Sequence, residues 1–118
     1  MEKKNPIKDK SYSFALKIIA LYRQLIANNE YVIGKQIVRS GTSIGANVEE
    51  ALHGQSKRDF IAKLSISLKE AHETNYWLRL LRDSSLLDVS YVQPLLLEIN
   101  ELISILTSII KTSRQNLG

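Results

Sequence analysis

The sequence predicts an all-α protein, an antiparallel up-down four-helix bundle formed by a single domain over residues 1–118. Two observations support this fold class. Apolar residues recur at steps of three and four positions in four separate segments, which is helical spacing, and alternating strand patterns are absent. Prolines number only two, and the connections between the segments are short. Short connections favour antiparallel packing of neighbouring helices around one core.

The first helix is predicted over residues 11–28, with Phe14, Ile18, Leu21 and Leu25 facing the core. The chain on either side of the bundle, before residue 11 and after residue 113, is expected to form frayed, solvated termini. The letters ANNE over residues 27–30 are typical of a turn. A second helix is predicted over residues 31–53, and Gly54 would end it in the C′ position.

The third helix is predicted over residues 57–83, because Ser56 and Asp59 resemble a capping box that starts a helix at Lys57. Its predicted core stripe consists of Phe60, Leu64, Leu68, Ala71, Asn75 and Leu78. The fourth helix is predicted over residues 90–113, with Pro94 in or near its first turn, where proline is tolerated. Its predicted stripe is Leu95, Ile99, Leu102, Leu106 and Ile109.

Composition narrows the class of protein. The chain has no cysteine, which excludes disulfides, thiolate metal sites and cysteine nucleophiles and fits a reducing compartment. The longest apolar runs fall far below the roughly 18 residues of a membrane span. The first ten residues lack a following apolar segment of the signal-peptide type. We therefore expect a soluble cytoplasmic protein with no membrane partner.

The stretch RSGTSIGANVEEA over residues 39–51 has two glycines and many small polar residues, as a phosphate-binding loop would. It lacks the lysine and the preceding strand that such a loop needs. At 100° per residue on a helix, its polar residues share one arc of about 100°. Gly34, Gly41 and Gly45 lie toward the adjacent apolar arc, where they would let another helix approach closely.

The polar arc is unusual because it holds hydrogen-bonding residues rather than the Lys and Glu of a solvated face. It includes Gln36, Arg39, Ser40, Ser43, Asn47 and Glu50. We interpret it as a partly buried hydrogen-bond network, within the bundle or across a subunit contact. A nucleic-acid or small-ligand surface and a plain exposed face remain as alternatives.

The third helix carries a second apolar face that points away from its predicted core stripe. This face consists of Ile66, Trp77, Leu80 and Leu81, and it also carries Glu70 and Glu73. An apolar strip with a tryptophan is more than a small monomer normally exposes, so it predicts an oligomer contact. The alternative is that the fourth helix covers it. Glu70 and Glu73 are expected to form ion pairs with Arg39 or with a neighbouring chain.

No enzyme is predicted. A di-iron bundle needs Glu-x-x-His on two helices and a glutamate on each of the others, but only Glu50 and His53 fit that spacing. His53 and His72 are expected to be exposed, and neither belongs to a recognisable catalytic constellation. We therefore predict no catalytic residue, no metal, no cofactor and no small-molecule substrate.

The chain is mildly basic, with a formal net charge of +4. Such an excess permits binding to a polyanion without demonstrating it. The candidate nucleic-acid contacts are Lys3, Lys4, Lys8, Lys10, Lys17, Arg23, Lys57, Arg58 and Lys63.

The second and third predicted helices together resemble a known family. The pattern formed by Gln36, Arg39, Ser43, Ile44, Asn47 and Glu50, followed by Ser67, Leu68, Glu70 and Glu73, is similar to that of proteins encoded in intervening sequences of bacterial 23S ribosomal RNA genes. The resemblance covers roughly residues 8–114. Gly45 and Ala51 depart from the proline and glycine that many members have there, but neither change removes a polar group.

This resemblance implies a helical bundle that assembles into a homopentameric ring and has no established catalytic activity. The family's link with ribosomal RNA is genomic, and distant relatives act as accessory subunits of diversity-generating reverse transcriptases through a basic surface. The first hypothesis is therefore a non-catalytic homo-oligomeric scaffold. The alternative is an accessory protein that binds RNA or DNA.

Overall fold

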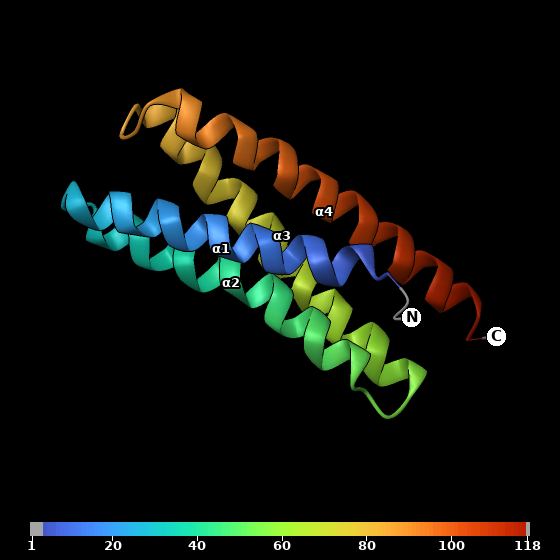
Figure 1. Ribbon diagram of the computed structural model, residues 1–118. Coiled ribbons are helices and arrows are strands. Elements are labelled where there is room, and N and C mark those ends of the chain that lie inside the picture. Colours follow the sequence, from blue (N-terminus) through green and yellow to red (C-terminus); the bar gives the residue numbers. More distant parts are fainter. Residues whose placement is uncertain (1–3, 118) are drawn as a thin grey trace.

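The protein is described here over residues 4–117 of a computed structural model, and this part of the chain forms four α-helices and no strand (Figure 1). The helices are α1 (Pro6–Ala27), α2 (Tyr31–Leu52), α3 (Lys57–Ser84) and α4 (Val89–Gln115). The all-α, four-helix prediction is confirmed. None of the four helices combines the length and the apolar character needed to cross a bilayer.

Within the described residues, the prediction of frayed termini is wrong for residues 6–10 and 114–115, which belong to helices α1 and α4. Helix α1 begins five residues earlier than predicted, because Asn5 is its N-cap and accepts a hydrogen bond from the Lys8 backbone N–H at 3.3 Å, followed by Pro6 in the first turn. This is a favourable helix start that a run of lysines obscured. Helix α4 begins after the N-cap Asp88, whose carboxylate accepts from the Ser90 N–H at 2.8 Å. That hydrogen bond lowers the pKa of the Asp88 carboxyl.

Two of the predicted turns form as expected and one differs in detail. Helix α3 begins at Lys57, because the Ser56 hydroxyl accepts from the Asp59 N–H at 3.1 Å. Between α1 and α2, Asn29 takes the left-handed conformation with φ of 61° that commonly ends a helix. Gly54 follows the α2 C-cap with its N–H donating to the Ala51 carbonyl at 3.1 Å, but it does not use the left-handed region.

Pro94 was predicted to lie in or near the first turn of the fourth helix, and it lies just beyond that turn. Helix α4 starts at Val89, so Pro94 is its sixth residue and lies inside the helix. Proline has no N–H, so the carbonyl of Ser90 loses the helical donor that residue 94 would otherwise supply. The α4 segment around Pro94 faces α1 across a cavity described below.

The core runs the length of the bundle, and its position on α3 differs from the prediction. Leu64, Ala71 and Leu78 are buried as expected. The half-buried residues are Phe60, Leu68 and Asn75, and the positions that join the core instead are Ile61, Ser67, Thr74 and Leu81. On α4 the stripe is confirmed except at its last position, where Ile110 is buried and Ile109 only half-buried. The buried face of α3 therefore includes two hydroxyl side chains.

The glycines of α2 bring it against α1, as predicted. A Cβ atom added to Gly41 would lie 2.8 Å from Cγ2 of Ile18, and one added to Gly45 would lie 3.3 Å from the Ser11 carbonyl oxygen. These pairs also show that α1 and α2 run in opposite directions, since rising residue numbers on α2 meet falling numbers on α1. The absence of side chains at these two positions sets the distance between the helices.

Candidate functional site at the contact of helices α2 and α3

An ion-pair cluster joins α2 to α3 on the outside of the bundle. The guanidinium of Arg39 lies 3.2 Å from a carboxylate oxygen of Glu70 and forms a second ion pair with Glu73. It also donates to the side-chain oxygen of Gln36 at 3.3 Å. The Arg39 side chain is 47% exposed, whereas those of Glu70 and Glu73 are 17% and 32% exposed. The structure therefore forms the ion pairs expected for Arg39 within one chain.

An aromatic pair extends this cluster along α3. The indole N–H of Trp77 donates to Glu73 at 3.0 Å, one turn away on the same helix. Tyr76 packs edge-on against Trp77 with ring centroids 5.1 Å apart, and Arg79 lies 5.7 Å above the Tyr76 ring. Glu73 thus accepts from both a guanidinium and an indole, which fixes its orientation. We call Gln36, Arg39, Glu70, Glu73 and Trp77 the Arg39 cluster.

Beneath this cluster lies a buried set of hydroxyl groups. The Ser67 hydroxyl donates to the Ile44 backbone carbonyl of α2 at 2.8 Å. The Thr74 hydroxyl lies 2.9 Å from the Ser40 hydroxyl and 2.8 Å from the Glu70 carbonyl. Ser40, Ser67 and Thr74 are all inaccessible to solvent. Because buried polar groups need partners, these contacts fix the rotation and register of α3 against α2.

The remaining predicted polar residues do not join the Arg39 cluster. Ser43 donates to the Arg39 carbonyl at 2.6 Å, and the Asn47 amide donates to the Ser43 carbonyl at 2.8 Å. Both side chains therefore bond the backbone of their own helix. Glu50 is exposed and lies 3.7 Å from Lys63. Sequence reasoning gave no role to Thr74, although its spacing of seven residues from Ser67 places both on one helical face.

The predicted oligomer residues divide between the surface and the core. Ile66 and Leu80 are 43% and 38% exposed, and Trp77 is half-buried against the core. Leu81 is fully buried, so its prediction as a surface contact was wrong. Leu81 shares its side of α3 with the buried Ser67 and Thr74. The buried face of α3 is therefore turned toward α2 relative to the predicted apolar stripe. The α3 face, as used below, consists of Ile66, Tyr76, Trp77 and Leu80.

The titratable groups form no recognisable catalytic set within residues 4–117. His53 and His72 are exposed, and the Nδ1 atom of His53 lies 2.8 Å from its own helix at the Glu49 carbonyl. No group of three His, Asp or Glu side chains in the described chain is arranged to hold a metal ion. In the Arg39 cluster, the guanidinium holds both carboxylates, so the arrangement serves to fasten α2 to α3 and to present an ordered polar surface.

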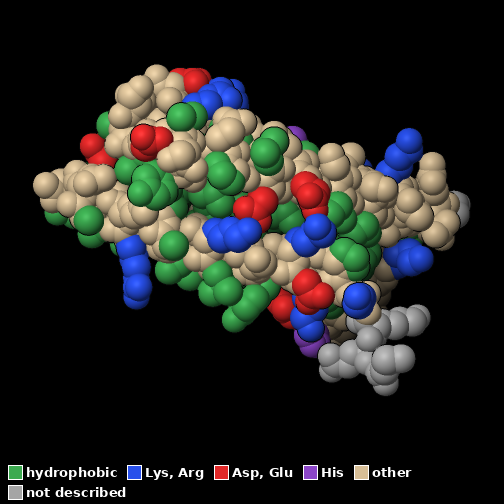
Figure 2. Space-filling view, turned by 45° about the horizontal axis from the view of Figure 1, so that its top comes forward, with side chains coloured by type: hydrophobic (Ala, Val, Ile, Leu, Met, Phe, Trp, Pro, Cys, Tyr) green, Lys and Arg blue, Asp and Glu red, His purple; other side chains and the backbone are tan. Residues whose placement is uncertain are grey.

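The candidate nucleic-acid contacts fall into two groups. Three of them are engaged in ion pairs: Lys10 with Glu101, Lys17 with Glu98 at 2.8 Å, and Lys63 with Glu50. Those without an acidic partner among residues 4–117 are Lys4, Lys8, Arg23, Lys57 and Arg58. Lys3 lies outside the described residues. Figure 2 shows Lys and Arg side chains at the right-hand end of the molecule and also at its left and upper edges, with acidic side chains beside the basic ones nearer the middle.

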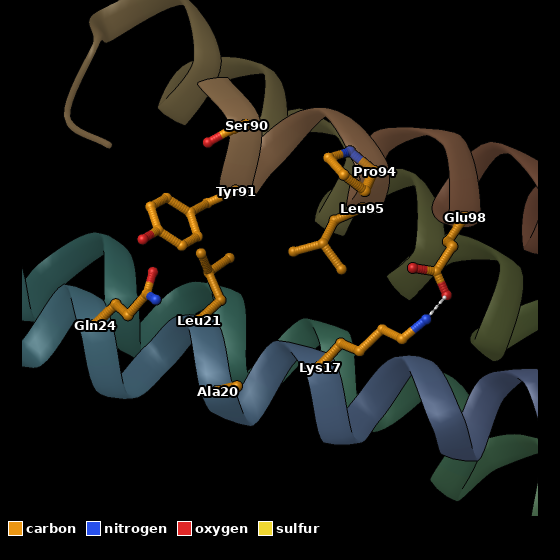
Figure 3. A pocket seen from close by; sticks show the side chains of 9 residues that line it. All are labelled: Lys17, Ala20, Leu21, Gln24, Ser90, Tyr91, Pro94, Leu95 and Glu98. Atoms are coloured by element: carbon orange, nitrogen blue, oxygen red, sulfur yellow. Dashed lines mark hydrogen bonds and ion pairs between the residues drawn. The ribbon is translucent and has the colours of Figure 1, made fainter. Parts of the chain in front are cut away.

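A cavity of about 310 Å³ opens between α1 and the first turns of α4 (Figure 3). Leu21 and Leu95 form its apolar floor, and the Tyr91 ring and Pro94 line the α4 side. Its two charged groups, Lys17 and Glu98, pair with each other at the edge. The sequence signal nearest to this cavity is Pro94, which was expected in or near the first turn of α4 and lies just beyond it. The cavity offers apolar surface but no unpaired charge.

Comparison with known proteins identifies a family and a similar solved structure for this chain. The family model described as 23S rRNA-intervening sequence protein matches residues 3–108. Among solved structures, a protein with unknown function from the S23 ribosomal protein family of Bacteroides thetaiotaomicron shares 47% sequence identity, with a TM-score of 0.86. The match covers 89% of this chain and 98% of that chain. No curated protein matches the sequence.

Proposed function

From the premise that the chain belongs to the 23S rRNA-intervening sequence protein family, we propose that it is a non-catalytic, homo-oligomeric scaffold. In this proposal the chain is an antiparallel up-down four-helix bundle that assembles with copies of itself into a ring, which the family resemblance suggests is pentameric. The helices supply the rigid body, and the surface around the Arg39 cluster supplies the contact between copies.

The observation that supports this proposal is the exposed α3 face beside the Arg39 cluster. Ile66, Tyr76 and Leu80 are 43%, 47% and 38% exposed. Ordered aromatic and arginine side chains next to apolar ones are typical of protein interfaces, where they are enriched relative to the remaining surface. A solvated helix face would carry Lys and Glu at these positions instead.

The test is the mass of the protein in solution, measured by sedimentation at micromolar concentration. The proposal expects a multiple of the 13.4 kDa chain mass, about five times for a pentamer. Replacing Ile66 by arginine should reduce that mass, while Leu97→Arg, on an exposed α4 position, should leave it unchanged. A wild-type chain that sediments at 13.4 kDa at this concentration would contradict the scaffold proposal.

We propose nucleic-acid binding as a second candidate function, supported by the distribution of cations that have no acidic partner among residues 4–117. Lys4 precedes α1, Lys8 lies in its first turn, and Lys57 and Arg58 lie in the first turn of α3. Figure 1 shows the start of α1, the α2–α3 turn and the end of α4 at the same end of the bundle. This end of the bundle therefore brings together segments that carry cations without an acidic partner among residues 4–117.

Salt dependence is the measurement that tests binding at this basic end. Fluorescence anisotropy with structured RNA and with duplex DNA should show affinity that falls steeply as salt is raised from about 50 to 200 mM. A Lys57→Glu, Arg58→Glu variant should lose this binding, whereas Lys17→Gln, at an already paired position, should change it little. Binding that is absent, or that does not respond to salt, would eliminate this candidate.

A further inference from the structure

A second apolar surface lies on α1, on a part of the molecule that the scaffold proposal does not use. Tyr12, Leu16 and Ile19 are 64%, 55% and 41% exposed. Their spacing of four and three residues places them in one stripe along the outside of the helix. Figure 2 shows hydrophobic side chains protruding along the lower edge of the molecule, on the side where α1 lies. We call these three residues the α1 stripe.

The α1 stripe borders a groove of about 500 Å³ between α1 and α2. Small side chains line its inner part, namely Ser11, Ala15, Thr42, Gly45 and Ala46. Gly45 lies at the bottom of this groove, where a Cβ would come within 3.3 Å of the Ser11 carbonyl oxygen, so α1 and α2 are in close contact there. A concave strip of small residues flanked by large apolar ones can accept protruding side chains from another helix.

The α1 stripe and the α3 face lie on different sides of the bundle. In the described chain, the backbone of α1 lies close to those of α2 and α4 but not to that of α3. The two helices are therefore diagonal to one another, and their outward faces point away from each other. Within one chain, the α1 stripe and the α3 face therefore cannot contact each other.

We propose that the α1 stripe of one copy docks on the α3 face of the next copy, so that every interface in the assembly joins two different surfaces. This inference rests on the proposed scaffold function and assigns its contact. The protruding Ile66, Tyr76 and Leu80 enter the groove beside the α1 stripe. Head-to-tail contacts of this kind generate closed rings when the rotation between copies closes.

The occupant is a second copy because one such contact covers both exposed surfaces at once. A two-fold contact of α1 with α1, or of α3 with α3, would leave the other apolar surface in water on every chain. Each surface exposes roughly 300 Å² of apolar side chain, which is at the level of a typical functional patch. Pairing the two would remove roughly 600 Å² of apolar surface from water, so the polar residues around them would have to contribute the remainder of the approximately 1,200–2,000 Å² of a stable interface.

The test uses two variants that each block one surface. Leu16→Arg blocks the α1 stripe and leaves the α3 face intact, whereas Leu80→Arg does the reverse. Both positions are exposed, so the folded chain accommodates the change, and circular dichroism verifies that each variant is helical. Each variant alone is expected to sediment at 13.4 kDa, and their mixture at about twice that mass. The mixture stops at a dimer because only one compatible pair of surfaces remains.

Other outcomes separate this inference from the scaffold proposal. Dimers of Leu80→Arg alone would indicate an α1–α1 contact, and dimers of Leu16→Arg alone an α3–α3 contact; either result overturns the inference and leaves the scaffold standing. A wild-type oligomer whose mass neither variant changes also overturns it. A monomeric wild-type chain overturns the scaffold proposal itself. Leu97→Arg serves as the control for adding a surface charge.

Discussion

Helix α2 contacts helix α1 and helix α3 through different kinds of interaction. On the α1 side, the backbone of α2 at Gly41 and Gly45 packs directly against α1. A Cβ on Gly41 would lie 2.8 Å from Cγ2 of Ile18. Toward α3, the buried Ser40 hydroxyl lies 2.9 Å from that of Thr74. The α1–α2 contact therefore depends on close packing, and the α2–α3 contact depends on buried hydrogen bonds.

This difference determines what each contact tolerates. A close-packed contact is sensitive to any added atom, because protein interiors hold few voids and neighbouring side chains must move. A hydrogen-bonded contact is sensitive to the loss of a single polar atom even when the shape of the side chain is retained. The outer Arg39 cluster adds a third kind of contact, which water partly screens.

The largest effect is expected from adding one methyl group on the α1 side. Gly41→Ala should lower the free energy of unfolding by about 1–3 kcal/mol, because the new Cβ overlaps the branched, fully buried Ile18 side chain. This loss exceeds the helix-propensity gain of at most about 1 kcal/mol. Urea unfolding at a fixed protein concentration would measure the change, since assembly shifts apparent stability.

Gly34→Ala is the matched control on the same helix and the same side. A Cβ at Gly34 would lie 3.4 Å from Cβ of Leu25, an ordinary van der Waals contact. That variant should be neutral or more stable by about 0.5–1 kcal/mol. Equal effects at Gly34 and Gly41 would show that propensity rather than close approach governs this contact.

The α1 side was predictable from the sequence, and the α3 side was predictable only in part. Three glycines on the apolar arc of one helix have few explanations other than close packing, and the structure confirms that reading for Gly41 and Gly45. Hydroxyl residues have no such signature, because Ser and Thr occur both in cores and on surfaces. Ser67 and Thr74 were therefore left out of the predicted core stripe, which placed the core of α3 too close to α4 and Leu81 on the surface.

The sequence predicted the helix start at Lys57 correctly, but it missed the start of α1, where lysines surround the capping residue. Ser56 with Asp59 correctly gave the start of α3. Asn5 and Pro6 encode the start of α1 just as directly, but the surrounding lysines were interpreted as a solvated tail. The Arg39 ion pairs were anticipated, whereas the α1 stripe was not, because an exposed face is recognised only once the packing of its helix is known.

The next effect in size is expected from removing a hydroxyl on the α3 side. Thr74→Val keeps the shape of the side chain but leaves the buried Ser40 hydroxyl without its partner on α3. We expect a loss of about 1–2 kcal/mol in the free energy of unfolding. Adding Ser40→Ala should then change stability by less than it does in the wild-type chain, because the shared interaction is already gone.

Thr107→Val is the control for this substitution. The Thr107 hydroxyl also donates to the carbonyl four residues earlier, at 2.7 Å to Ile103, but the residue is exposed. Its replacement should change stability by no more than about 0.5 kcal/mol. If Thr107→Val were as harmful as Thr74→Val, the local bond within each helix, rather than the α2–α3 contact, would account for the loss.

The smallest effect on folding is expected at the most conspicuous polar feature, the Arg39 cluster. Arg39→Ala removes both ion pairs, but the guanidinium is about half-exposed, with 47% of the side chain accessible. Exposed pairs of this kind contribute about 0.2–1 kcal/mol, so the unfolding free energy of the chain at fixed concentration should fall by no more than that. Raising salt to about 1 M should reduce the difference in unfolding free energy between Arg39→Ala and the wild type, since ions screen exposed charges.

The same salt change should leave the effect of Thr74→Val in place, because the Thr74–Ser40 pair is buried and uncharged. A loss for Arg39→Ala that exceeds the loss for Thr74→Val, or that resists salt, would mean that the outer ion pairs rather than the buried hydroxyls hold α2 to α3.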